Sequence, residues 1–140
     1  IEVMESKPEL SSKIKEIILA APDIDAEVFK TEIAPKMVSE TQKPITLYVS
    51  ADDLALKASK LLNGKPRAGD VDNLPIIIDG IETIDATGVD TSFLRHSYFA
   101  DNSSIISDIF DLIESGNRAL KRELLFLVQL QTQFYFKVKE

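Results

Sequence analysis

The stretch that decides the fold is ITLYVSADD at residues 45–53, together with IETIDAT at residues 81–87. Each reads as a short apolar strand that runs into a loop. The first loop opens on two adjacent carboxylates, Asp52 and Asp53. The second leads through an irregular segment to His96, the only histidine in the chain. The sequence therefore places an acid after one strand and a histidine after the next.

Strand and helix patterns alternate around these two stretches. Strands are predicted at residues 14–21, 45–50, 74–78 and 81–85. Helices are predicted at residues 25–37, 54–62 and 103–114. Asp25 is the expected N-cap of the first helix, and Pro35 is expected to limit its regularity. The expected buried face of the second helix consists of Leu54, Ala55, Ala58, Leu61 and Leu62. This alternation is the signature of βαβ units, so the fold class is α/β with a parallel sheet.

The last part of the chain has a different pattern. Residues 130–138 alternate between apolar and polar side chains, which is typical of an edge or hairpin strand with one wet face. The competing interpretation is a helix that continues over residues 120–130. We expect residues 1–116 to form the main unit, and residues 117–140 to form an extension with a helix followed by an edge strand.

Composition excludes several classes of protein. The chain has 140 residues, of which 44% are hydrophobic, and this is enough for one domain with its own core. A net charge of −7 argues against nucleic-acid binding, which needs a basic face. There is no cysteine, so disulfides, thiolate nucleophiles and cysteine-based zinc sites are excluded. No apolar run approaches the ~20 residues that span a bilayer. We expect no cofactor and no metal. The sequence does not indicate a cellular compartment.

The order of acid and histidine matches the last two members of a Ser/Asp/His triad as an α/β-hydrolase arranges them. His96 would act as the general base, and Asp53 would orient and stabilise its imidazolium form. Asp52 is the alternative acid, and either carboxylate can also be a plain helix cap. The serines near these loops, at positions 50, 92 and 97, lack the flanking glycines of a nucleophile elbow. The nucleophile is therefore expected outside this sequence.

Four blocks together resemble a known family. They are LAAPDIDAEVF at residues 19–29, TLYVS at 46–50 ahead of Asp53, IETIDA at 81–86 and HSYF at 96–99. In this order they are similar to a bacterial family of α/β-hydrolases without assigned function, over roughly residues 13–112. The resemblance implies an α/β-hydrolase fold, a Ser/Asp/His triad and esterase- or lipase-like chemistry. It also implies that the first strands and the serine elbow lie N-terminal to this chain.

Three hypotheses follow from the sequence. In the first, the chain is the C-terminal part of a hydrolase that acts on a small-molecule ester, and it contributes Asp53 and His96. In the second, it is a truncated, non-catalytic module that pairs with a second chain or copy through an exposed sheet edge, since the strand at residues 14–21 lacks an outer neighbour. The third is a flavodoxin-like binding module, but the acidic segment at residues 22–25, where its phosphate loop would lie, would repel an anion.

Overall fold

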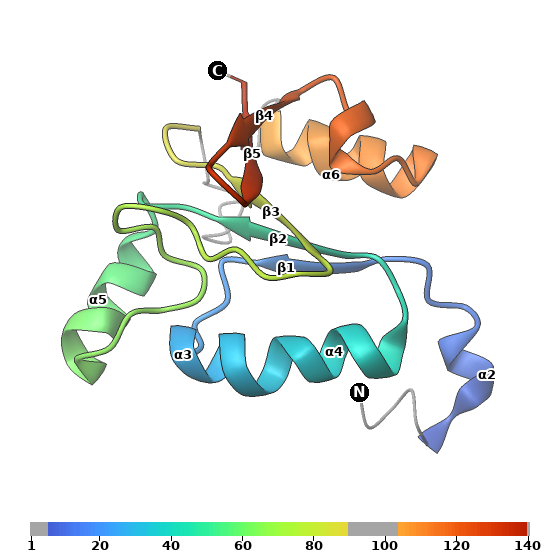
Figure 1. Cartoon of the computed structure of the whole chain (residues 1–140), viewed down its shortest axis with the longest axis horizontal. Coiled ribbons are helices and arrows are strands. Elements are labelled where there is room, and N and C mark those ends of the chain that lie inside the picture. The colour runs from blue at the N-terminus through green and yellow to red at the C-terminus, as the bar shows by residue number, and fades with distance from the viewer. Residues whose placement is uncertain (1–5, 90–103, 140) are drawn as a thin grey trace.

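The computed structural model describes residues 6–89 and 104–139 and has a mixed α/β architecture built on one sheet (Figure 1). The strands are β1 (Ile17–Ala20), β2 (Ile45–Val49), β3 (Ile81–Asp85), β4 (Leu125–Gln129) and β5 (Phe134–Val138). The sheet order is β1-β2-β3-β5-β4, with all neighbours parallel except β5 and β4. The predicted α/β class, with parallel strands alternating with helices, is confirmed.

Helices cover both faces of the sheet (Figure 1). The helical elements are α2 (Pro8–Ser11), α3 (Ala26–Val28), the π turn η1 (Phe29–Ile33), α4 (Ala34–Thr41), α5 (Leu54–Asn63), α6 (Ser104–Ser115) and the 3₁₀ turn η3 (Ala119–Lys121). The segment from α3 to α4 lies on one face, where Ile45, Leu47 and Val49 of β2 pack around Phe29. On the opposite face Tyr48 of β2 belongs to the cluster that contains Ile105 of α6. The alternation along β2 therefore supplies both cores.

The helical segment after β1 contains a π-helical turn, η1, between α3 and α4. Asp25 caps its start, because one carboxylate oxygen accepts two first-turn backbone N–H groups at 3.0 Å. In η1 the N–H of Ala34 donates to the carbonyl of Phe29, five residues earlier. Pro35 follows, and proline has no N–H and crowds the carbonyl four residues before it. A wide turn at this point fits that constraint, so both expectations for this helix are confirmed.

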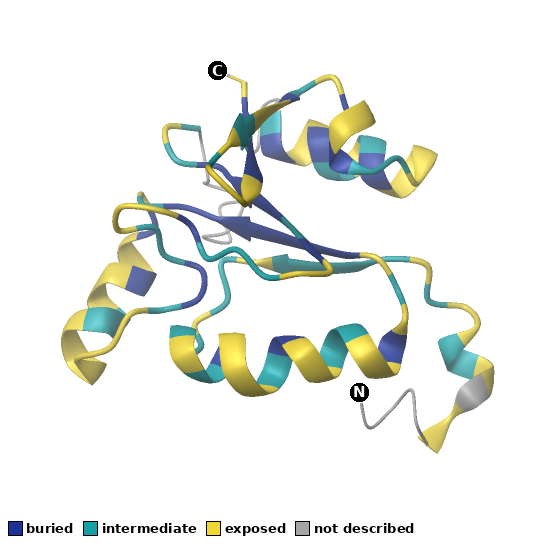
Figure 2. Ribbon diagram, viewed as in Figure 1, coloured by how far each residue is buried: buried dark blue, intermediate teal, exposed yellow. Residues whose placement is uncertain are grey.

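Two expected features are wrong. Residues 74–78 form no strand. This segment contains Pro75, which has no N–H, and its Ile76 carbonyl accepts the Thr83 hydroxyl at 2.8 Å. The predicted buried face of α5 is also incorrect, because Leu61 and Leu62 are 86% and 87% exposed and Leu56 is the buried leucine. The physical reason is position: α5 lies beyond the strand ends rather than across a sheet face (Figures 1 and 2).

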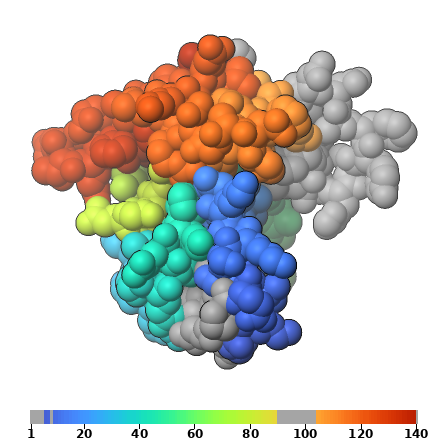
Figure 3. All heavy atoms as spheres, turned by 90° about the vertical axis from the view of Figure 1, so that its right-hand side faces the viewer, coloured from blue at the N-terminus to red at the C-terminus, as the bar shows by residue number. Residues whose placement is uncertain are grey.

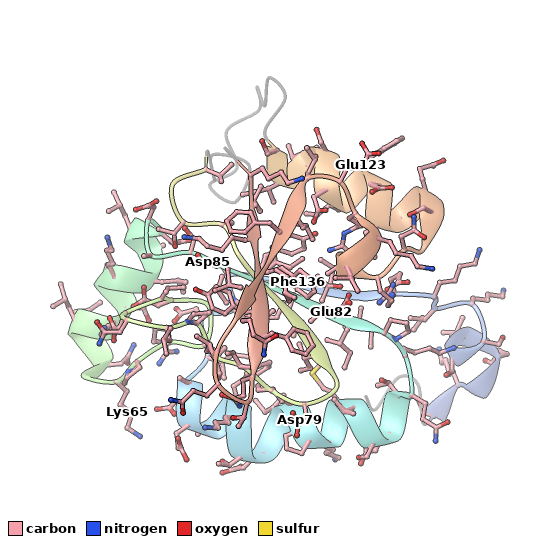
Figure 4. All side chains as sticks on the ribbon, turned by 45° about the horizontal axis from the view of Figure 1, so that its top comes forward. Lys65, Asp79, Glu82, Asp85, Glu123 and Phe136 are labelled. Carbon is pink, nitrogen blue, oxygen red and sulfur yellow. The ribbon has the colours of Figure 1, made fainter. Side chains whose placement is uncertain are left out.

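The C-terminal residues add a hairpin to the sheet. The period-two pattern at residues 130–138 corresponds to β5, which is a hairpin strand rather than an edge strand, since it lies between β3 and β4. The competing helix over residues 120–130 is wrong, because β4 occupies residues 125–129. Figure 4 labels Phe136 of β5, whose Cα pairs with that of Ile84 in β3. The expected helix at the start of this extension is limited to η3.

A buried ion pair with a hydrogen-bonded tyrosine joins the sheet, α6 and the segment before β4. Tyr48, Asp108 and Arg122 are all buried, with exposed fractions of 1%, 0% and 2%. The tyrosine hydroxyl donates to Oδ2 of Asp108 at 2.6 Å. Arg122 donates through Nε at 2.9 Å and Nη2 at 3.2 Å to the two carboxylate oxygens. Burial first, and then the charge of Asp108, raise the pKa of Tyr48 above its usual range, so its hydroxyl remains a donor.

This network predicts an asymmetry in stability. Arg122→Met would leave the Asp108 carboxylate buried without a cation, and we expect the free energy of unfolding to fall by about 3–5 kcal/mol. Tyr48→Phe removes one hydrogen bond to a charged acceptor and should cost about 1.5–3 kcal/mol. Urea unfolding followed by circular dichroism measures both. If Arg122→Met cost less than Tyr48→Phe, the ion pair would not be the dominant member of the network.

Candidate functional site

The loops that follow β2 and β3 meet at one edge of the sheet. The two strands are parallel and in register, with Val49 opposite Asp85. Beyond them the N–H of Ala86 donates to the carbonyl of Val49 at 2.8 Å. The N–H of Ala51 donates to the hydroxyl of Thr87 at 2.9 Å. Hydrogen bonds therefore hold the two loop starts against each other, at the carboxyl ends of parallel strands where α/β proteins build their sites.

Asp53 is held at the N-terminus of α5. Its Oδ1 accepts the backbone N–H of Ala55 at 2.9 Å and that of Leu56 at 3.1 Å, which makes it the N-cap. The residue is 7% exposed. Both of these hydrogen bonds use Oδ1, so the carboxylate is fixed in orientation through one oxygen.

Asp52 has a different set of partners. Its Oδ2 accepts the backbone N–H of Gly88 at 2.7 Å, and so joins the loop after β2 to the loop after β3. Its own N–H donates to the hydroxyl of Ser50 at 3.1 Å. Ser50 is buried, and its hydroxyl serves this turn. The two adjacent carboxylates therefore do separate things: Asp53 caps a helix and Asp52 anchors the neighbouring loop.

A third carboxylate at this edge, Asp85, was not singled out in the sequence. It is labelled in Figure 4 and is the last residue of β3. It is 5% exposed. Its Oδ1 accepts the N–H of Thr87 at 2.9 Å, and its Oδ2 lies 3.8 Å from Nζ of Lys137 in β5. The signal in the sequence was the Asp-x-Thr spacing at a strand end, which is typical of an Asx-type turn.

The loop at residues 65–73 closes the same edge over β1 and β2. The carbonyl of Gly69 accepts the N–H of Ser50 at 2.9 Å, and the N–H of Gly69 donates to the carbonyl of Pro22 at 3.0 Å. A Cβ atom on Gly69 would lie 2.4 Å from the carbonyl carbon of Ala21, so only glycine allows this approach. Ala21 itself has a φ of 44°, in the left-handed region. At this edge the main chain of Gly69 therefore lies in direct contact with the main chain at residues 21–22.

The other acidic residues of these loops serve structural contacts. Asp23 accepts the hydroxyl of Ser59 at 2.7 Å and pairs with Arg67, and the Ser59 hydrogen bond is the largest cause that lowers the pKa of Asp23. Lys60 pairs with Asp70 and Asp72. Among the described residues, no group of three or more acidic, histidine or cysteine side chains could hold a metal ion.

An open cleft of about 520 Å³ lies beside the loop start at Ala51. It runs between α5 and the loop at residues 65–73, and its lining contains Lys57, Lys60, Asp70 and Asp72. Both signs of charge are therefore present along its wall.

His96, Ser92 and Ser97 lie outside the described residues, so the distance from His96 to either carboxylate is a prediction from the sequence. Within residues 6–89 and 104–139, no helix is long and apolar enough to cross a membrane.

Comparison with known proteins finds one family. The sequence model of the family described as alpha/beta hydrolase of unknown function (DUF900) matches residues 2–115. No curated protein and no solved structure matches the chain. The matched range includes β1, β2 and β3 with both loop starts and ends at the last residue of α6.

The separate partners of the two carboxylates predict a reciprocal result in amide hydrogen exchange. Asp52→Ala should accelerate exchange at the N–H of Gly88 and leave Ala55 and Leu56 unchanged, because only the Gly88 bond is lost. Asp53→Ala should accelerate Ala55 and Leu56 and leave Gly88 unchanged, with a loss of about 0.5–2 kcal/mol in stability. NMR-detected exchange measures all three sites. Equal acceleration at all three in either variant would contradict the separation.

Proposed function

We propose, from the premise that this chain belongs to the family of α/β-hydrolases of unknown function, that it supplies the acid and the histidine of a Ser/Asp/His triad. In this proposal Asp53 is the acid and His96 the general base of an esterase-like hydrolase. The serine nucleophile lies on a segment outside this sequence. The substrate is a small-molecule ester.

The observation that carries the proposal is the hydrogen-bonded pair of loop starts after β2 and β3. It brings Asp52 and Asp53 beside the loop that continues toward His96 in the sequence. A triad needs an acid that stays ionised and fixed while the imidazole gains and loses a proton. The two hydrogen bonds to Oδ1 at the N-terminus of α5 fix the orientation of the Asp53 carboxylate.

The same geometry supports Asp53 over Asp52 as the acid. Asp53 is nearly buried and is fixed by two hydrogen bonds through Oδ1, whereas Asp52 is exposed and makes one such bond, to Gly88 of the neighbouring loop. An acid must accept the Nδ1–H of the imidazole, which then takes a proton from the serine hydroxyl and returns it to the leaving group. In this arrangement Asp52 positions the loop before the histidine, and Asp53 acts on the histidine.

A non-catalytic module is the second proposal, favoured by the outer edge of β1. The N–H groups of Ile17 and Ala21 donate toward β2, so those of the alternate residues Ile18 and Ala20 point away from it. Among the described residues no strand pairs with this edge. A partner chain could add a strand here.

The mass of the native polypeptide separates the proposals: a longer product with an upstream Gly-x-Ser-x-Gly supports the enzyme, and a native product of 140 residues supports the module.

The test of the triad is hydrolysis of short p-nitrophenyl esters. The protein that carries this chain together with the serine segment should hydrolyse them, and His96→Ala should lower kcat by on the order of 10³-fold or more with less effect on KM. Asp53→Asn should also lower kcat, and by more than the matched control Asp52→Asn, because asparagine at position 52 keeps an oxygen for Gly88.

The 140-residue chain alone should show no turnover, because it lacks the nucleophile and the main oxyanion-hole donors. Turnover by the isolated chain that Ser97→Ala abolishes would overturn the missing-nucleophile proposal. A larger loss of kcat with Asp52→Asn than with Asp53→Asn would exchange the roles of the two carboxylates.

A further inference from the structure

The outer edge of β4 lacks the usual protection of an edge strand. Among the described residues, β5 is the only strand that pairs with it. Soluble proteins protect such edges with lysine, proline, bulges or inward-pointing charges, because free main-chain groups recruit further strands. β4 reads LFLVQ, with no charge and no proline over residues 125–129. The sequence of β4 therefore contains none of the charged or proline residues that block pairing at an edge.

The ladder with β5 decides which main-chain groups of β4 point outward. The N–H of Leu130 donates to the carbonyl of Gln133, and the N–H of Lys139 donates to that of Leu124. Even-numbered residues of this strand therefore bond toward β5, and residues 125, 127 and 129 point their N–H and C=O groups away from it. The N–H of Leu125 donates back to the carbonyl of Arg122 at 3.3 Å. Leu127 and Gln129 supply the outward donors.

The side chains along this edge are apolar and partly exposed. Phe126 is 44% exposed and Leu127 is 43% exposed, and they point to opposite faces of the sheet. Phe134, at the start of β5, is 53% exposed and stacks edge-to-face on Phe136 with ring centroids 5.9 Å apart. Apolar surface thus flanks the outward main-chain groups on both sides of the sheet.

We propose that the outer edge of β4 pairs with β4 of a second copy of this chain, antiparallel, about a two-fold axis at Leu127. In this register Leu127 faces its own counterpart and exchanges N–H and C=O with it. The N–H of Gln129 donates to the carbonyl of Leu125 in the other copy, and the axis repeats this bond. Phe126 then lies opposite Val128, an aromatic and β-branched pair of the kind that stabilises sheets.

Self-complementarity favours a second copy as the occupant, because the two-fold register pairs Phe126 with Val128 on both sides of the axis and the strand LFLVQ carries no charge. The net charge of −7 on each chain opposes association at long range, but the contact itself is uncharged. The strand is uncharged, and in this register the nearest acidic residue, Glu123, falls opposite Gln131. No like charges meet. A pair of five-residue strands buries less than the ~1,600 Å² of a standard interface, so the dimer should be reversible and concentration-dependent. The proposal is independent of any hydrolase activity.

Single cysteines test the register, and the natural chain contains none. In Leu127→Cys the two sulfur-bearing residues would face each other at a Cα distance of ~5.5 Å, which suits a disulfide. Phe126→Cys is the matched control, because it is equally exposed but its counterpart lies diagonally, at ~7–8 Å or more. We expect a covalent dimer on a non-reducing gel for Leu127→Cys and none for Phe126→Cys. Cross-linking of Phe126→Cys, or of both variants alike, would overturn the register.

Sedimentation velocity tests the interface itself. Leu127→Lys would bring two ammonium groups together at the axis, and we expect loss of the dimer. Leu61→Lys makes the same change on α5 and should leave the dimer intact. Circular dichroism verifies that both variants are folded, as expected for partly exposed positions. A wild-type chain that stays monomeric at every concentration, or a dimer that survives Leu127→Lys, would overturn the proposal.

Discussion

The ion pair between Asp108 and Arg122, with the Tyr48 hydroxyl, is the interaction on which one whole face of the sheet depends. Burial of an isolated carboxylate is prohibitive, so α6 can press Asp108 against the sheet only where a cation and donors meet it. Arg122 supplies the cation from the segment before β4, and Tyr48 supplies a donor from β2. These bonds fix α6 against the sheet. They also fix the segment that leads into the β4–β5 hairpin and cover the apolar cluster beneath it. In Figure 3 α6 and the C-terminal residues form one continuous layer at the top of the molecule.

Local features of the fold could be predicted from the sequence, because their causes are local. β2 follows from a short apolar run, and the start and end of α5 follow from Asp53 and from Gly64, whose φ is 66°. The buried network could not be predicted, because Tyr48 and Asp108 are 60 residues apart and a single sequence carries no signal that joins them. The exposure of Leu61 and Leu62 was missed for a related reason: periodicity identifies an apolar face but does not say whether anything lies against it.

At the candidate site the sequence predicted Asp52 and Asp53 but not which backbone groups each carboxylate binds. Asp52 and Asp53 look equivalent as neighbours before a helix, and both fit the pattern of a cap. The backbone turn at Ser50 separates them, since it directs one side chain to the first turn of α5 and the other to Gly88. The signal at Asp85, an Asp-x-Thr spacing at a strand end, is typical of a turn and does not by itself indicate a functional site. Such assignments depend on the exact direction of each Cα–Cβ bond, which spacing alone does not specify.

The place of β5 inside the sheet has a consequence for how the molecule is made. The last strand in the sequence is a middle strand in space, between β3 and β4. A chain that emerges from the ribosome N-terminus first can therefore align β1, β2 and β3 early, but β3 keeps an open side until residues 134–138 have been synthesised. Contacts between segments this far apart in sequence form late, since loop closure precedes any gain from them. We expect the addition of β5, rather than formation of the first strands, to be the step that closes the sheet.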